Sequence, residues 1–219
     1  MKRSIICSIA ITVGLLFSPS SHAILPTLKT VNEALVNDFN QRSATFLLQK
    51  DYASAAANAE FAIETVESNL GENHPAIALS RRQLFEAYRA LKQFEKAENV
   101  LLRSIQITET AIGKDHLNLV LHLNDLADLF LEQKQYDKAE PIYLRQLNIL
   151  EKSVGELHPH TILTLEKLVT IYTAQGNSEK AQQLLDHINT LRKKTAIPMS
   201  RSLVSSTHSA DRDCYPSAT

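Results

Sequence analysis

The sequence predicts an all-α fold, an α-solenoid of about four helix-turn-helix repeats, and three observations support this prediction. The 219 residues include only 5 glycines and are rich in Ala, Leu, Gln, Glu and Lys, which favour helices. An apolar–Gly–x–x–His segment recurs every 42 residues, as LGENH from residue 70, IGKDH from 112 and VGELH from 154. Leucines, aromatic residues and alanines between these segments keep the same offset, which indicates internal repeats.

The first 23 residues have the pattern of a cleaved signal peptide. Lys2 and Arg3 precede an apolar run from Ile5 to Phe17, and small residues at 21 and 23 place the cleavage after Ala23. The run is shorter than the ~20 residues that span a bilayer. We therefore expect an exported protein, periplasmic or secreted, with an uncleaved amino-terminal anchor as the alternative.

The composition narrows the class of protein further. The formal charge is −1 and no basic block stands out, so nucleic acid is not an expected partner. No later segment is apolar enough to suggest stable membrane insertion. Cleavage removes Cys7 and leaves Cys214, so the mature chain cannot form an internal disulfide and must be stabilised by packing.

Each repeat is expected to consist of two amphipathic helices. In the third repeat Leu119, Leu123, Leu126 and Phe130 share one helical face, and the residues KQY then form a turn before a second helix. The pattern predicts a repeat domain over residues 24–194, with a disordered tail from 195 to 219. The expected helix pairs are 31–49 with 52–69, 75–91 with 94–111, 117–133 with 136–153, and 159–175 with 178–194.

The recurring Gly–x–x–His segment is interpreted as one helix ending and the next beginning. Glycine suits the carboxyl end of a helix, and proline suits the first position of the next. His74 and His158 are then expected at amino-terminal capping positions, whereas Leu117 replaces the proline and leaves the third start less sharply fixed. Equivalent histidines along a solenoid edge cannot converge on a metal, so we expect no metal site and no cofactor.

An aromatic residue precedes an alanine by nine positions in each helix pair, as in Tyr88/Ala97 and Phe130/Ala139. This spacing resembles the tetratricopeptide repeat, and the period of 42 residues with a Gly-x-x-His-Pro turn is similar to the kinesin light chain type. The resemblance spans roughly residues 50 to 190 and is weakest in the end repeats. It implies a solenoid whose first helices line a concave face that binds an extended peptide or a partner helix.

The repeat register assigns residues to this concave face. Arg82 and Arg89 could hold a partner carboxylate, and the amides of Asn40 and Asn124 could bind a peptide backbone. For each residue, an ordinary solvated position is the alternative. The full set is Asn37, Asn40, Ala44, Leu79, Arg82, Glu86, Arg89, Leu121, Asn124, Asp128, Leu131, Leu163, Glu166, Lys167 and Thr170.

The ligand preference of kinesin light chains is not expected to apply to this chain. Kinesin light chains favour acidic aromatic peptides in a basic groove, but here Glu86, Asp128 and Glu166 dilute the positive charge. We therefore expect a mixed-charge ligand or one recognised through its backbone.

These observations predict an exported, non-enzymatic scaffold for protein–protein interaction. The sequence contains no nucleophile–base pair, glycine-rich phosphate loop, His-Glu-x-x-His motif or paired cysteines, so an enzyme is not expected. The alternative is a self-assembling repeat protein that forms a homodimer or larger homo-oligomer, because the alanine-rich residues 51–64 would also suit helix packing between chains.

Overall fold

In the computed structural model, which describes residues 28–69, 71, 74 and 77–196, the chain forms eight helices and no strand. The helices are α2 (Leu28–Leu48), α3 (Tyr52–Asn69), α4 (Ile77–Ala90), α5 (Phe94–Ile112), α6 (Leu119–Glu132), α7 (Tyr136–Val154), α8 (Pro159–Ala174) and α9 (Ser178–Ala196). The predicted signal peptide and all but the first two residues of the predicted tail lie outside the described residues.

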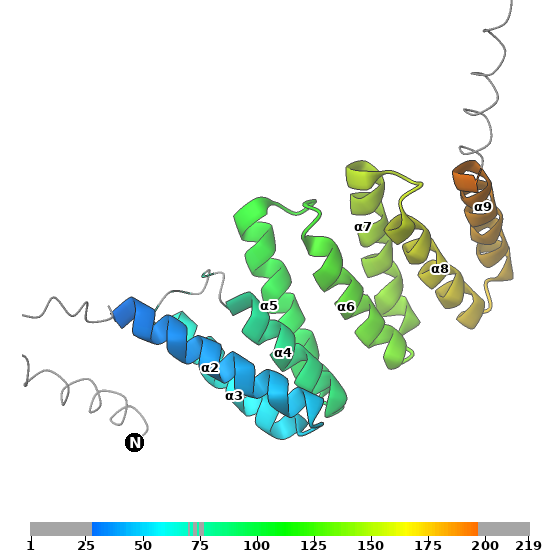
Figure 1. The fold of residues 1–219 in the computed structure, drawn as a ribbon. Helices are drawn as coiled ribbons and strands as arrows, with labels where there is room; N and C mark the ends of the chain where they lie inside the picture. Colours follow the sequence, from blue (N-terminus) through cyan, green and yellow to red (C-terminus); the bar gives the residue numbers. More distant parts are fainter. Residues whose placement is uncertain (1–27, 70, 72–73, 75–76, 197–219) are drawn as a thin grey trace, which may run out of the picture.

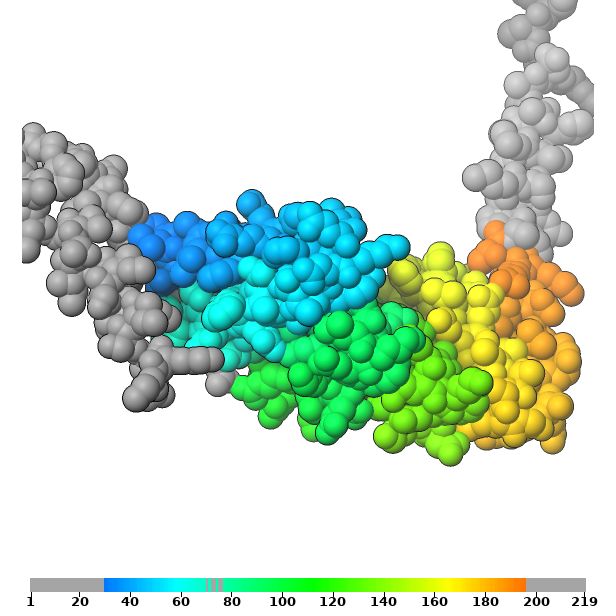
Figure 2. Space-filling model, turned by 90° about the horizontal axis from the view of Figure 1, so that it is seen from below, coloured from blue at the N-terminus to red at the C-terminus, as the bar shows by residue number. Residues whose placement is uncertain are grey.

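The helices pair into four hairpins that stack in sequence order. Each helix packs against the next one along the chain, and Figure 1 shows the hairpins side by side in a row with α2 and α9 at opposite ends. The space-filling view in Figure 2 shows the same order from blue to orange. This arrangement confirms the predicted α-solenoid.

The helix bounds lie within three residues of those expected. α2 begins at Leu28 and α9 continues to Ala196, whereas α6 begins at Leu119, two residues later than expected. Leu117 stands where the other two segments have proline, but this does not explain the late start, because α4 also begins two residues later than expected, at Ile77, in a segment that has proline. At the start of α6 the Leu119 and Val120 N–H groups donate to the carbonyls of His116 and Leu117 at 3.0 Å, and the Ile77 N–H donates to the His74 carbonyl in the same way.

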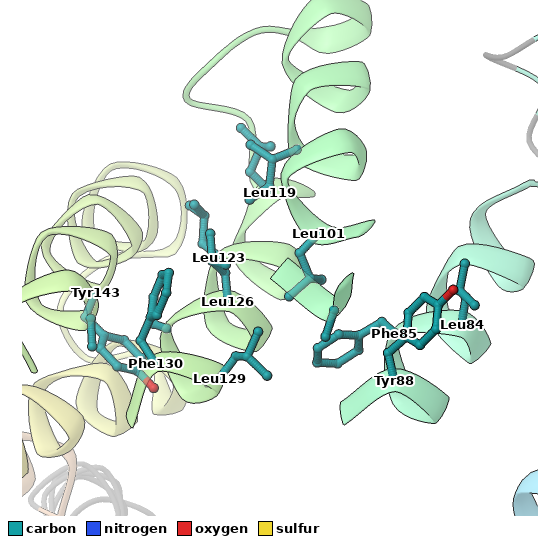
Figure 3. Close-up of a cluster of buried hydrophobic side chains, with 14 of the residues drawn as sticks. Leu84, Phe85, Tyr88, Leu101, Leu119, Leu123, Leu126, Leu129, Phe130 and Tyr143 are labelled. Atoms are coloured by element: carbon teal, nitrogen blue, oxygen red, sulfur yellow. The ribbon is translucent and has the colours of Figure 1, made fainter. Parts of the chain in front are cut away.

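A continuous apolar core runs through the stacked hairpins. It extends from Ala55 of α3 to Ala181 of α9. Figure 3 shows Phe85 of α4, Leu129 and Phe130 of α6 and Tyr143 of α7 within this core. A single hairpin cannot bury both of its apolar sides, so burial is completed only between neighbours.

The turns inside the hairpins contain left-handed residues that the sequence analysis did not assign. Lys50, Lys92 and Lys134 have φ of 61°, 60° and 58°, and the equivalent position in the last hairpin is Gly176 with φ 75°. In the second hairpin, the Gln93 N–H donates to the Tyr88 carbonyl at 2.9 Å and the Lys92 N–H donates to the Arg89 carbonyl at 3.0 Å. This is the Schellman pattern of helix termination, and it recurs in all four hairpins.

The turns between hairpins use glycine in a different conformation. Gly113 and Gly155 have φ of 97° and 87° with ψ of 160° and 167°, a region that is essentially restricted to glycine. His158 then caps α8, because its Nδ1 accepts a hydrogen bond from the His160 N–H at 3.2 Å. The predicted helix-stop and capping roles are confirmed at this turn.

We predict that Ala139→Leu lowers the free energy of unfolding by ~1–3 kcal/mol, because the added carbons overpack a contact that leaves Ala139 0% exposed. Ala57→Leu, the same change at an exposed position of α3, is the control and should alter stability little. Urea denaturation checks both variants. Equal stability of the two would show that Ala139 does not lie at a tight helix crossing.

A second comparison concerns two glycines that both have positive φ and no neighbouring atom within 4 Å of an added Cβ. Gly155→Ala should cost about 1–3 kcal/mol, because its backbone conformation is nearly exclusive to glycine. Gly176→Ala should cost less, about 1 kcal/mol, since lysine occupies the equivalent position in three other turns. Thermal or chemical unfolding measures both, and the reverse order would contradict this assignment.

Candidate functional site

The first helices of the four hairpins, α2, α4, α6 and α8, carry the residues predicted for ligand binding, and we call their shared surface the first-helix face. Leu79, Leu121 and Leu163 occupy the same repeat position on α4, α6 and α8 and are 54%, 51% and 47% exposed. Three exposed leucines at a fixed spacing give this face an apolar row.

The predicted arginines on this face already have carboxylate partners. Arg82 of α4 contacts Glu86 through Nε at 3.1 Å and Asp125 of α6 through Nη1 at 3.4 Å. Arg89 Nε donates to Glu132 Oε2 at 2.8 Å, which again joins α4 to α6. These pairs neutralise the charge of one repeat with that of the next, so the face has no unpaired arginine row to attract an acidic partner.

A second polar network joins α6, α7 and α8 at Asp128. The Asp128 carboxylate accepts hydrogen bonds from Asn124 Nδ2 at 2.9 Å, from the Tyr143 hydroxyl at 2.5 Å and from Lys167 Nζ at 2.7 Å. Asp128 and Lys167 were predicted as ligand-binding residues, but they are engaged with each other. Asn124 is held by this network through its nitrogen, and its Oδ1 accepts no hydrogen bond from the described residues.

Burial perturbs the ionisable groups around these networks. Burial raises the pKa of the Asp125 carboxyl, and the nearby Arg82 guanidinium only partly opposes the shift. Burial lowers the pKa of His122, and the positive charge of Arg82 lowers it further. Burial raises the pKa of Tyr143, and its hydrogen bond to Asp128 raises it further. Tyr143 therefore remains a protonated donor to Asp128.

Asn40 does not lie where the register predicted. It is 5% exposed, and its Oδ1 accepts a hydrogen bond from the Ser80 hydroxyl at 2.8 Å. Gln83 Nε2 also donates to the Asn40 backbone carbonyl at 3.1 Å. The reason is that α2 packs directly against α4 as well as α3, which closes the surface over Asn40. Its amide links two helices and is not presented to a ligand.

A cleft of about 550 Å³ opens between α6, α7 and α8. The predicted residues Leu121, Asn124 and Leu163 line it. Residues of the second helix α7 also line it, which the sequence analysis did not predict. The lining residues are Leu117, Asn118, Val120, Leu121, Asn124, Gln146, Leu150, Val154, His158, His160, Leu163 and Thr164.

Gln146 is the unexpected member of this lining. It is 4% exposed, its Nε2 donates to the Thr164 hydroxyl at 3.3 Å, and its Oε1 is buried without a partner among the described residues. The equivalent positions in the other repeats hold Ala62, Ser104 and Ile188, which are small or apolar. A long polar side chain on the buried face of a second helix was the signal in the sequence.

The preceding pair of repeats has a smaller equivalent cleft of about 140 Å³ between α4, α5 and α6. There Arg82 stands at the position of Asn124, and His122 stands at that of Thr164. Because the longer Arg82 side chain reaches across to Asp125, it fills part of the space that remains open beside Asn124. The two clefts therefore differ in size and in charge.

The described residues do not gather three His, Cys, Asp or Glu side chains close enough to hold a metal ion. The repeated histidines belong to turns. His116 Nδ1 accepts from the Asn118 N–H at 3.2 Å, as His158 does two residues before His160. Among the helices of the described segment, none has the length and apolar character to cross a membrane.

The sequence profile of the tetratricopeptide repeat matches residues 39–110, 86–152 and 118–194. A search of curated proteins gives no match. Among solved structures, BtubC (BKLC) from P. vanneervenii is similar, with 19% identity over 86% of this chain and 70% of that chain and a TM-score of 0.66.

Two further structures show the same fold. The kinesin light chain TPR-like repeats from Podosopora anserina share 20% identity over 73% of this chain and 76% of that chain, with a TM-score of 0.62. The apo form of RapI shares 17% identity over 80% of this chain and 60% of that chain, with a TM-score of 0.60. The predicted resemblance to kinesin light chain-type repeats is thus confirmed.

The lowered pKa of His122 predicts a pH dependence of stability. Unfolding restores the ordinary value of about 6.5, so the unfolded chain binds the proton more readily, and stability falls as the pH drops below that value. His122→Thr, which copies Thr164 of the next repeat, should reduce this loss between about pH 7 and pH 5. Denaturation midpoints at each pH check it, and parallel curves for the two proteins would contradict it.

Proposed function

Because the chain belongs to the tetratricopeptide repeat family, we propose that it is a non-enzymatic scaffold that binds an extended peptide or a partner helix on a concave first-helix face. The repeats imply protein partners. The observation that carries the finer proposal is the cleft between α6, α7 and α8, which is about 550 Å³ and combines exposed leucines with an oriented amide.

The charge pattern also supports binding through shape and main-chain contacts. Arg82, Arg89 and Lys167 are each paired with a carboxylate on the neighbouring first helix. A strongly acidic ligand would have to displace these internal partners. An extended segment whose backbone meets Asn124 needs no such exchange.

We propose further that the protein acts outside the cytoplasm, after export by residues 1–23. The support is the basic start, the apolar run and the small residues before Ile24. Expression of the full chain in a bacterium followed by amino-terminal sequencing tests this proposal. A mature protein that begins at Ile24 in the exported fraction is the expected result, and an intact amino terminus in the cytoplasm contradicts it.

Self-assembly is the second candidate, and the outer surface of the first hairpin favours it. Val31 and Leu35 of α2 and Phe61 of α3 are all exposed, and Phe61 stacks on Phe39 with ring centroids 5.7 Å apart. Light scattering on the wild type and on Phe61→Asp separates the candidates. A tight oligomer that dissociates in the variant would favour assembly.

We predict that random peptides selected from a display library for binding to the mature chain no longer bind its Asn124→Arg variant. This substitution introduces the longer side chain found at the equivalent position of the smaller cleft, where it occupies space. Asn148→Arg is the matched control, because it makes the same change at an exposed position of α7 outside the cleft. If both variants lose peptide binding equally, or if neither loses it, the binding site does not lie in this cleft.

A further inference from the structure

The cleft between α6, α7 and α8 differs in chemistry from the rest of the first-helix face. Elsewhere on this face, arginine and lysine side chains meet carboxylates of the neighbouring repeat. The described residues that line the cleft include no Asp, Glu, Lys or Arg. Six of them are apolar, namely Leu117, Val120, Leu121, Leu150, Val154 and Leu163.

We propose that this cleft accepts one large uncharged side chain of the partner, such as leucine or phenylalanine, while the partner's adjacent main-chain N–H donates to Asn124 Oδ1. This inference rests on the proposed function and names the chemistry of its ligand. A charged side chain would leave water for a cleft whose lining combines six apolar residues with uncharged amide and hydroxyl groups and two histidines, and which offers no Asp, Glu, Lys or Arg partner. Such a transfer is unfavourable. An apolar side chain instead covers exposed leucine on both sides of the cleft.

Asn124 is prepared for this role by the network behind it. Its Nδ2 donates to Asp128, and Asp128 is fixed by hydrogen bonds from the Tyr143 hydroxyl and from Lys167. The carboxamide therefore has one preferred orientation, in which Oδ1 is the atom left to accept from a ligand. Asp128 acts through Asn124 and is a positioning residue.

Gln146, like Asn124, favours a ligand that carries a hydrogen-bond donor. Its Oε1 is buried and accepts no hydrogen bond from the described residues. An unpaired buried acceptor is costly, so a polypeptide, which brings N–H groups with its apolar side chain, suits this cleft better than a purely hydrocarbon ligand.

The equivalent cleft between α4, α5 and α6 lacks these properties. It is about 140 Å³, and Arg82, Arg81 and Asp125 line it. The Arg82–Asp125 contact at 3.4 Å crosses this region. The chain therefore has a cleft for an apolar side chain at the α6–α8 junction, while the α4–α6 junction is occupied by its own charges.

The test uses short synthetic peptides and methyl-labelled mature chain. Acetylated and amidated peptides Ser-Gly-X-Gly-Ser, with X as Leu, Phe, Asp or Lys, are titrated while the leucine methyl signals are followed by NMR. The Leu and Phe peptides should shift the methyl signals of Leu121 and Leu163, and the Asp and Lys peptides should bind at least about tenfold more weakly. Asn124→Arg should abolish the shifts, and Asn148→Arg should preserve them.

A backbone variant of the peptide tests the hydrogen bond. An ester in place of the amide at X removes the N–H and should weaken binding about two- to tenfold. In Asp128→Asn the amide and ester peptides should bind more nearly alike, because Asn124 loses its fixed orientation. A merely structural effect of Asp128 would weaken both peptides by the same factor and would overturn its positioning role.

Three results would overturn the inference. Equal binding of the Asp peptide at the same methyl groups would reject the apolar side chain while leaving groove binding in place. The absence of any shift at millimolar peptide would reject the cleft, and the proposed function would fall with it only if peptide display also selected nothing. A wild-type dimer that Asn124→Arg converts to a monomer would show that a second copy of the chain occupies the cleft.

Discussion

Each hairpin in this protein has apolar surface on both sides, and the rest of the structure depends on the packing that this requires. The alanines near the helix crossings bring two helices together, and the remaining apolar side chains are then covered only by the hairpins before and after. A lysine or glycine in the left-handed backbone conformation follows the first helix of each pair. Glycine follows the second helix in the middle two pairs. The constant geometry of these turns keeps successive hairpins in register.

A constant register places equivalent residues of neighbouring repeats side by side, so the functional surface is determined by differences between repeats. Arg82 and Asn124 occupy one repeat position, yet the cleft beside Arg82 and its ion pair measures about 140 Å³ and the cleft beside Asn124 about 550 Å³. Similarly, Gln146 replaces a serine of the preceding repeat and introduces a buried carboxamide. The repeats thus form two equivalent clefts among the described residues, and these clefts differ in the side chains at the same repeat positions.

The sequence was sufficient for features that depend on neighbours along one helix or one turn. The helix bounds, the capping by His158 and the buried Ala139 all follow from local spacing. It was insufficient where the partner comes from another repeat. Asn40 was expected on the surface but is covered by α4, and the charges of Arg82 and Lys167 are neutralised by Asp125 and Asp128 of α6. Such contacts depend on how hairpins stack, which the repeat period alone does not specify.

The most direct test of the central claim is a crystal structure of residues 24–219 bound to a peptide obtained by selection. This account predicts that one apolar side chain of the peptide lies between Leu121 and Leu163, with its main-chain N–H within hydrogen-bond distance of Asn124 Oδ1. A peptide bound instead on the second-helix surface, or along Arg82 and Arg89 with their internal ion pairs broken, would contradict it.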